Sequence, residues 1–153
     1  MLVRMPHKTE SYAAIICVSL GLVVSTLLAP KNSFFLANAA FYWASQLGVL
    51  AFVFLFEPRP AIVAGVAIAL ATYLAAFGIW VFTRMHPDSM AWLLYVFSLP
   101  GATVGAVGVA GALRSRSTLH PLIAGSVTAC VVLAGVILNQ AAVCSTFFYC
   151  LGK

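Results

Sequence analysis

The sequence contains very little charge. Of its 153 residues, eight are Lys or Arg and three are Asp or Glu, so charged residues make up 7% of the chain. Soluble globular proteins carry about 25% charged residues, which cover the surface that faces water. The hydrophobic fraction of 63% and the mean hydropathy of +1.08 point the same way. We therefore predict an integral membrane protein.

The long apolar runs have no Lys, Arg, Asp, Glu or His in their interiors. Proton relays and buried acid–base sites in membranes are built from such side chains. His7, His86 and His120 fall in the amino-terminal segment or in the joints between runs, on two different sides, so they do not together form a haem or metal site. The sequence has no Cys-x-x-Cys pair, phosphate-binding glycine loop or nucleophile elbow. These absences favour a non-catalytic protein without a cofactor.

Five apolar runs make up nearly all of the chain. A bilayer core of about 30 Å needs about 20 apolar residues per helix, and a continuous apolar run favours a helix over a barrel strand, which alternates in polarity. We predict an all-α fold in which residues 1–153 form a single transmembrane domain. It would be a polytopic bundle of five helices joined by short loops, with four helices as the alternative. The predicted helices cover residues 12–29, 34–56, 61–82, 89–113 and 121–148.

The basic residues near the ends of these runs predict an orientation, because Lys and Arg are retained on the cytoplasmic side. With the amino terminus in the cytoplasm, five basic residues lie inside and three outside. We predict this orientation, with the carboxyl terminus outside, in the bacterial inner (plasma) membrane. The net charge of +5 does not indicate nucleic acid, because the basic residues are spread over both sides. They are Arg4, Lys8, Arg59, Arg114 and Arg116 inside, and Lys31, Arg84 and Lys153 outside.

The fourth run contains a row of small residues. Gly101, Gly105, Gly108 and Ala112 are spaced i, i+4, i+7 and i+11, which aligns them on one helical face where another backbone can approach closely. We predict a close helix contact there, either inside the bundle or with a partner that is a second copy or another membrane protein. Pro100 precedes the row and is expected to kink or loosen the helix. Similar rows in the second and third runs are Ala37, Ala44, Gly48 and Ala51, and Ala61, Gly65, Ala69, Thr72 and Ala76.

Four amide side chains stand out among the polar residues within the apolar runs. They are Asn38 and Gln46 in the second run and Asn139 and Gln140 in the fifth. An amide in hydrocarbon needs a hydrogen-bond partner, and bonds between membrane helices contribute about 0.6–2 kcal/mol each. Internal bonds are the favoured interpretation, because a polar pathway normally includes an ionisable side chain. A polar pathway is the alternative.

Two of the four cysteines form a candidate disulfide. Cys144 and Cys150 lie at the end of the fifth run that is predicted to be non-cytoplasmic, where a disulfide persists if the compartment is oxidising. On a continuous helix they would be about 9 Å apart along the axis, which is too far for a disulfide. The bridge therefore requires the helix to end near Phe147. Cys17 and Cys130 are expected to be small buried residues.

Three functions remain open on these observations. The favoured hypothesis is a protein that binds another membrane component, such as an accessory subunit, an assembly factor or an immunity-type protein that neutralises a membrane-acting toxin. Small-residue faces without chemistry-bearing side chains motivate it. The first alternative is a small-solute transporter or channel, as a single chain or an oligomer, lined by the four amides. The second is an enzyme that acts at the membrane surface on a lipid through His86, Asp88 and His120.

Overall fold

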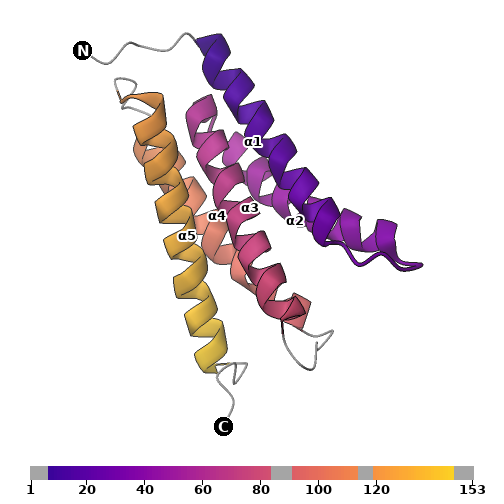
Figure 1. The fold of residues 1–153 in the computed structure, drawn as a ribbon. Coiled ribbons are helices and arrows are strands. Elements are labelled where there is room, and N and C mark those ends of the chain that lie inside the picture. The colour runs from indigo at the N-terminus through magenta and orange to yellow at the C-terminus, as the bar shows by residue number, and fades with distance from the viewer. Residues whose placement is uncertain (1–6, 84–90, 114–118, 147–153) are drawn as a thin grey trace.

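The structure is a computed structural model that describes residues 7–83, 91–113 and 119–146. These residues form five helices, and each is long and apolar enough to cross a membrane (Figure 1). The predicted all-α bundle of five helices is confirmed, and the four-helix alternative is wrong. The helices are α1 (His7–Leu28), α2 (Phe35–Phe54), α3 (Pro60–Phe82), α4 (Ala91–Leu113) and α5 (Pro121–Thr146).

The observed helix ends differ from the predicted ones where a helix extends beyond its apolar run or stops short of the run's end. Helix α1 begins at His7, five residues before the predicted start, and includes Glu10 in its first turn. A carboxylate is stabilising there because the amino-terminal end of a helix carries partial positive charge. Helix α3 begins at Pro60, since proline needs no hydrogen-bond partner for its nitrogen in the first turn. Helix α2 is shorter than its run and ends at Phe54.

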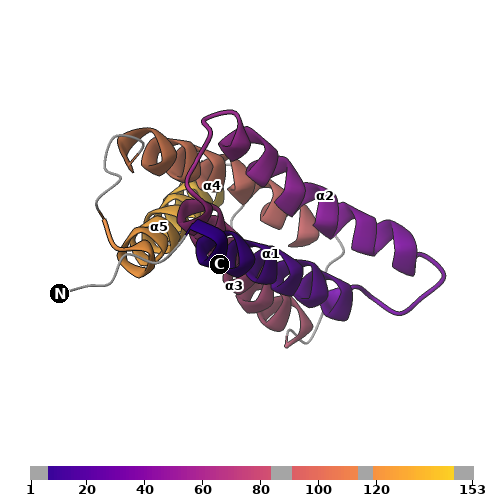
Figure 2. The same ribbon diagram turned by 90° about the horizontal axis from the view of Figure 1, so that it is seen from above.

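Helix α3 is the centre of the bundle. Val66, Leu70 and Leu74 on this helix are fully buried. Helix α1 packs along α3, and so does α5, whereas α1 and α5 share no extensive contact with each other. Helix α4 pairs most extensively with α5, and α2 packs mainly on α4 (Figures 1 and 2). Helices α1 and α5 diverge from the end at which both begin, and α3 lies between them (Figure 1).

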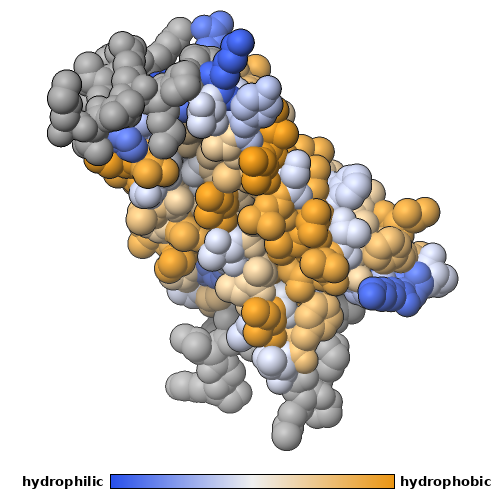
Figure 3. Space-filling model, turned by 45° about the horizontal axis from the view of Figure 1, so that its top comes forward, coloured by the Kyte–Doolittle hydropathy of each residue, from blue (hydrophilic) through white to orange (hydrophobic). Residues whose placement is uncertain are grey.

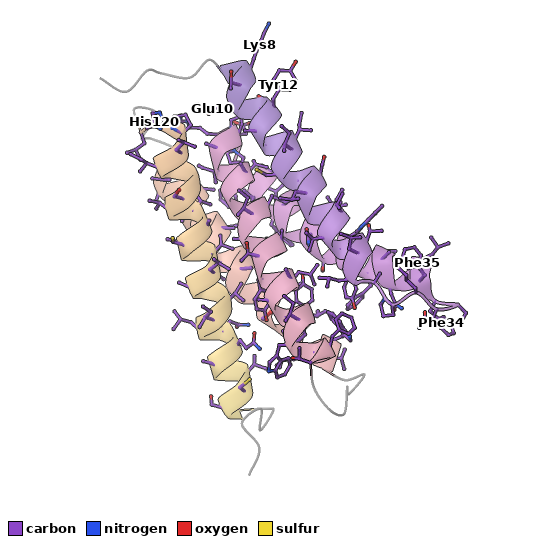
Figure 4. The ribbon with its side chains drawn as sticks, in the orientation of Figure 1. Lys8, Glu10, Tyr12, Phe34, Phe35 and His120 are labelled. Carbon is purple, nitrogen blue, oxygen red and sulfur yellow. The ribbon has the colours of Figure 1, made fainter. Side chains whose placement is uncertain are left out.

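Polar residues gather at the two ends of the bundle. Lys8, Glu10 and His120 lie at the end where α1 and α5 begin (Figure 4). On the face shown in Figure 3, hydrophobic residues cover the middle and hydrophilic residues lie towards the ends. The turn between α1 and α2 projects beyond the other helices, and Phe34 in this turn is 68% exposed (Figure 4). These apolar surfaces suit contact with hydrocarbon instead of water.

Candidate functional site

The first half of the predicted small-residue row packs against α5. A Cβ atom built on Gly101 would collide with the carbonyl oxygen of Gly135 and lie 2.5 Å from the Cβ of Asn139. A Cβ on Gly135 would in turn lie 2.5 Å from the carbonyl oxygen of Gly101. At Gly105 the nearest atom would be the Val131 carbonyl oxygen, at 3.1 Å. Glycine at these positions allows the two backbones to touch, which is how small residues hold membrane helices together.

The second half of the row is exposed in the described structure. A Cβ built on Gly108 would meet no atom within 4 Å, and the same holds for Gly111. Ala112 is also exposed. We call Gly108, Gly111 and Ala112 the α4 open face. Helix α2 has a similar exposed row, which we call the α2 open face; it consists of Ala44, Gly48 and Ala51. A Cβ built on Gly48 would meet no atom within 4 Å, and Ala44 and Ala51 are exposed.

The small residues of α3 also form a close helix contact. A Cβ on Gly65 would collide with the Gly125 carbonyl oxygen and lie 2.9 Å from the Cβ of Thr128. From the opposite side, a Cβ on Gly125 would lie 3.2 Å from the Ala61 carbonyl oxygen. Thr128 is fully buried, and its hydroxyl donates to the Ala124 carbonyl within its own helix at 2.7 Å. This contact joins α3 to α5 near the starts of both helices.

Gln46 connects α2 to α1. Its Nε2 donates to the Ser25 hydroxyl at 2.8 Å, and that hydroxyl donates to the Gly21 carbonyl at 2.8 Å. Gln46 is 3% exposed, so the bond is shielded from competing donors. A Cβ at Gly21 would lie 2.7 Å from the Oε1 of Gln46, and glycine therefore makes room for the amide.

The two amides of α5 point to different helices. Asn139 Nδ2 donates to the Phe97 carbonyl of α4 at 2.6 Å, in the turn that precedes Pro100. Helix α4 continues through Pro100, which has no N–H to donate to the preceding turn. Gln140 Oε1 accepts a hydrogen bond from the Tyr73 hydroxyl of α3. Asn38, the fourth predicted amide, lies near the start of α2 and is partly exposed.

The amides are therefore distributed over separate helix interfaces. Gln46 serves α1 and α2, Asn139 serves α4 and α5, and Gln140 serves α3 and α5. Among the described residues, every buried side-chain nitrogen or oxygen has a hydrogen-bond partner. An amide that already bonds a neighbouring helix must break that bond before it can line a pathway. The placement favours internal bonds over a shared polar pathway.

A buried cluster of aromatic rings at the interface of α2, α3 and α4 was missed by the sequence reasoning. The ring of Tyr42 lies 4.8 Å from that of Trp92, and the rings of Tyr73 and Tyr95 stack at 5.6 Å. Tyr95 is fully buried, and its backbone carbonyl accepts a hydrogen bond from the Ser98 hydroxyl. Tyrosines in membrane proteins concentrate at the two membrane interfaces, so a tyrosine within an apolar run is a sequence signal for a ring packed inside the bundle.

An ion pair ties together the starts of three helices. Arg59 Nη2 lies 3.2 Å from Glu10 Oε1, and Arg59 Nη1 donates to the Leu119 carbonyl at 3.3 Å. Glu10 is 8% exposed and the Arg59 side chain is 25% exposed. The pair joins the beginning of α1 to the residue before α3 and to the segment that leads into α5. The two residues are 49 positions apart, and no short-range motif in the sequence links them.

Two apolar cavities flank α1. One, of about 400 Å³, lies between α1, α3 and α5, with Glu10 at its polar end. The other, of about 380 Å³, lies between α1, α2 and the start of α3, and Ser19 contributes to its wall. None of the four predicted amides lines either cavity. The first is lined by Thr9, Glu10, Ala13, Cys17, Ala61, Ala64, Gly65, Ile68, Pro121, Leu122, Gly125, Ser126 and Ala129.

The cysteines differ in state and position. Cys144 is disulfide-bonded, whereas Cys17 and Cys130 are free. Neither free cysteine is fully buried as expected: Cys17 lines the first cavity, and Cys130 is exposed on α5. Helix α5 is described as far as Thr146, and Phe147, near which a Cys144–Cys150 bridge requires the helix to end, lies outside the described residues. Cys150 itself lies outside the described residues, as do His86 and Asp88.

Comparisons of the chain with models of protein families, with curated proteins and with solved structures find no match. The candidate sites therefore depend on the geometry alone. In residues 7–83, 91–113 and 119–146, no group of three or more His, Cys, Asp or Glu is placed to hold a metal ion. The features with unassigned roles are the two open faces and the two cavities.

Proposed function

We propose that this protein is a non-catalytic membrane protein that acts by binding another membrane protein through the α2 and α4 open faces. The observation that supports the proposal is the open space around Gly48, Gly108 and Gly111. Glycine in a helix interior costs about 1 kcal/mol relative to alanine. At Gly101 the close approach of α5 compensates for this cost, but at the three open glycines no contact within the described chain does so.

The open faces suit a helix as the partner. Small residues on an exposed face let a second helix approach until the backbones touch, as Gly101 and Gly135 do inside the bundle. A contact of this kind is compatible with an accessory subunit, an assembly factor or an immunity-type protein. A second copy of the chain can occupy the same faces, and the mass of the complex distinguishes it from a different protein. The amides supply no comparable support for a transporter, because each bonded amide serves a different helix pair.

We also propose that the amino terminus is cytoplasmic and the carboxyl terminus outside, in the bacterial inner membrane. Lys8 and Arg59 lie at the end where α1 and α3 begin, which is the side expected to retain basic residues. Cys144 lies near the opposite end of the bundle and is disulfide-bonded. Disulfides persist in oxidising compartments, which supports an external location for that end. Cys150 is its proposed partner.

Co-purification of matched variants tests the binding proposal. Wild-type chain is cross-linked in its native membrane, extracted in mild detergent and analysed for attached proteins. Gly48→Leu and Gly108→Leu fill the open faces, whereas Ala141→Leu adds similar bulk at an exposed position of α5 outside both faces. We expect the combined glycine variant to lose the partner by about tenfold or more, which corresponds to about 1.4 kcal/mol. Ala141→Leu should retain the partner.

The control for folding is that the glycine variants unfold in detergent at a temperature no lower than the wild type does, because a Cβ atom at either glycine meets nothing within 4 Å. Two results would refute the proposal. One is a wild-type chain that is monomeric and captures no protein from its native membrane. The other is a combined glycine variant that retains the partner as well as the wild type does.

A further inference from the structure

The cavity between α1, α3 and α5 has the size of a small-molecule site and begins at the polar end of the bundle. Its volume is about 400 Å³, and ligand sites in proteins usually measure about 300–1,000 Å³. It extends along α1 from Thr9 to Cys17, which is about 12 Å of helix. Glu10 lies at the end where α1 and α5 begin (Figure 4). Because half of the hydrocarbon core is about 15 Å thick, a cavity that begins at this end remains within one leaflet.

Glu10 offers the cavity a carboxylate oxygen without a hydrogen-bond partner. The side chain is 8% exposed, and its Oε1 lies 3.2 Å from Nη2 of Arg59. Its Oε2 accepts no hydrogen bond within the described chain. The described residues include no sealed side-chain oxygen that lacks a partner, so this oxygen is accessible. When an apolar molecule displaces water from the cavity, the oxygen therefore requires a hydrogen-bond donor on that molecule.

The ion pair of Glu10 and Arg59 favours a neutral donor. Arg59 already neutralises the carboxylate, so a cationic head group would leave a buried cluster with one uncompensated positive charge, which is costly in hydrocarbon. An anionic head group would meet Oε2 as a like charge. Lys8 and Glu57, the other charged residues described at this end, are exposed, opposite in sign and outside the cavity. A hydroxyl group donates a hydrogen bond without either cost.

Ser126 provides a second polar contact deeper in the cavity. Serine and threonine hydroxyls within helices can bond to the carbonyl one turn earlier, as those of Thr103 and Thr128 do. The Ser126 hydroxyl makes no hydrogen bond within the described chain, although it lines an otherwise apolar wall of α5. Ser126 lies about 7–8 Å along the helix from Pro121, where α5 begins. Its hydroxyl can donate to an acceptor such as an ester carbonyl.

We propose that the cavity between α1, α3 and α5 binds a neutral acylglycerol of the diacylglycerol type. Its free glycerol hydroxyl donates to Oε2 of Glu10, an ester carbonyl accepts from the Ser126 hydroxyl, and its acyl chains lie along Ala64 and Ile68 of α3. A phospholipid has a charged phosphate in place of that free hydroxyl. This acylglycerol site is separate from the α2 and α4 open faces, since no residue of either open face lines the cavity. Its occupation would connect α1 to α5, which share no extensive contact within the chain.

Three ligands that differ in one group test both contacts on the unaltered protein. They are dioleoylglycerol, its acetylated form, which has no free hydroxyl, and the corresponding dioleyl diether, which has no ester carbonyl. The full-length chain is mixed with each ligand in detergent micelles, and binding is measured by native mass spectrometry. Wild type should bind dioleoylglycerol about tenfold more tightly than the acetylated form, because a hydrogen bond to a charged acceptor is lost. It should bind dioleoylglycerol about fivefold more tightly than the diether, which loses a hydrogen bond between neutral groups.

Substitutions of Ser126 locate the site. Ser126→Ala should bind dioleoylglycerol about fivefold more weakly than the wild type does, and it should no longer distinguish dioleoylglycerol from the diether. Ser126→Phe fills the cavity and should bind none of the three ligands. Ser19→Phe is the matched control in the second cavity and should bind as the wild type does. Both serines are exposed, so an unfolding temperature equal to that of the wild type is the control for folding.

The native cysteines provide a second measurement. Cys17 lines the cavity and Cys130 does not, so the alkylation of each by N-ethylmaleimide can be compared by peptide mass spectrometry in one sample. Dioleoylglycerol should slow the labelling of Cys17 about tenfold relative to its acetylated form and leave Cys130 unchanged. Equal binding of dioleoylglycerol and its acetylated form, full binding by Ser126→Phe, or tighter binding of a phospholipid than of dioleoylglycerol would each overturn the proposal.

Discussion

Replacing Gly101 and Gly108 separately by alanine should change stability in opposite directions, although the two glycines belong to one predicted row. The added Cβ at Gly101 lies 2.5 Å from the Cβ of Asn139, whereas carbon atoms normally pack at about 3.5–4.0 Å. Helices α4 and α5 must therefore separate by about 1 Å or more. At Gly108 the added Cβ meets no atom within 4 Å.

The expected magnitudes follow from this geometry. Overpacking a close contact costs about 1–3 kcal/mol. Separation also weakens the 2.6 Å hydrogen bond from Asn139 to the Phe97 carbonyl, a loss of about 0.6–1.7 kcal/mol. Alanine recovers up to about 1 kcal/mol of helix propensity. Gly101→Ala should therefore lower the free energy of unfolding by about 2 kcal/mol, whereas Gly108→Ala should raise it by up to about 1 kcal/mol.

Unfolding in detergent micelles, titrated with a denaturing detergent and followed by far-ultraviolet circular dichroism, measures both changes. Gly135→Ala is a second variant at the same contact and should resemble Gly101→Ala, because its Cβ would lie 2.5 Å from the Gly101 carbonyl oxygen. A Gly101→Ala protein that is as stable as the wild type would refute this reasoning. So would a Gly101→Ala protein whose free energy of unfolding changes in the same direction as that of Gly108→Ala, because the first glycine would then not be in a close contact and the second in open space.

Two further predictions concern an amide and the orientation. Gln46→Leu should lower the free energy of unfolding by about 1 kcal/mol in the same titration, because it removes the hydrogen bond to Ser25. Adding Ser25→Ala to this variant should lower the free energy of unfolding little further. Additive losses would show that the two side chains are not coupled. Alkaline phosphatase fused at the carboxyl terminus should be active, and a fluorescent reporter that folds only in the cytoplasm should be dark at the same position. The opposite pattern would contradict the orientation proposed from Lys8, Arg59 and Cys144.

The positions of the helices were predictable from local composition, and the missed features all involve distant residues. Apolar runs place the five helices to within a few residues, except at α1, where a polar first turn precedes the apolar run. The ion pair of Glu10 and Arg59 and the stacked rings of Tyr73 and Tyr95 join residues from different helices. Periodicity within one run carries no information about which residue of another run lies opposite.

The sequence alone determined that the chain forms five apolar helices. In hydrocarbon, each backbone N–H and C=O must find its partner within the same segment, so an uncharged run of about 20 residues has few structures other than a helix. Tertiary structure decided what each helical face contacts. Gly101 touches Gly135 while Gly108 meets open space, and Gln46 pairs with Ser25, because the rotation and crossing of each helix depend on the packing of all five together.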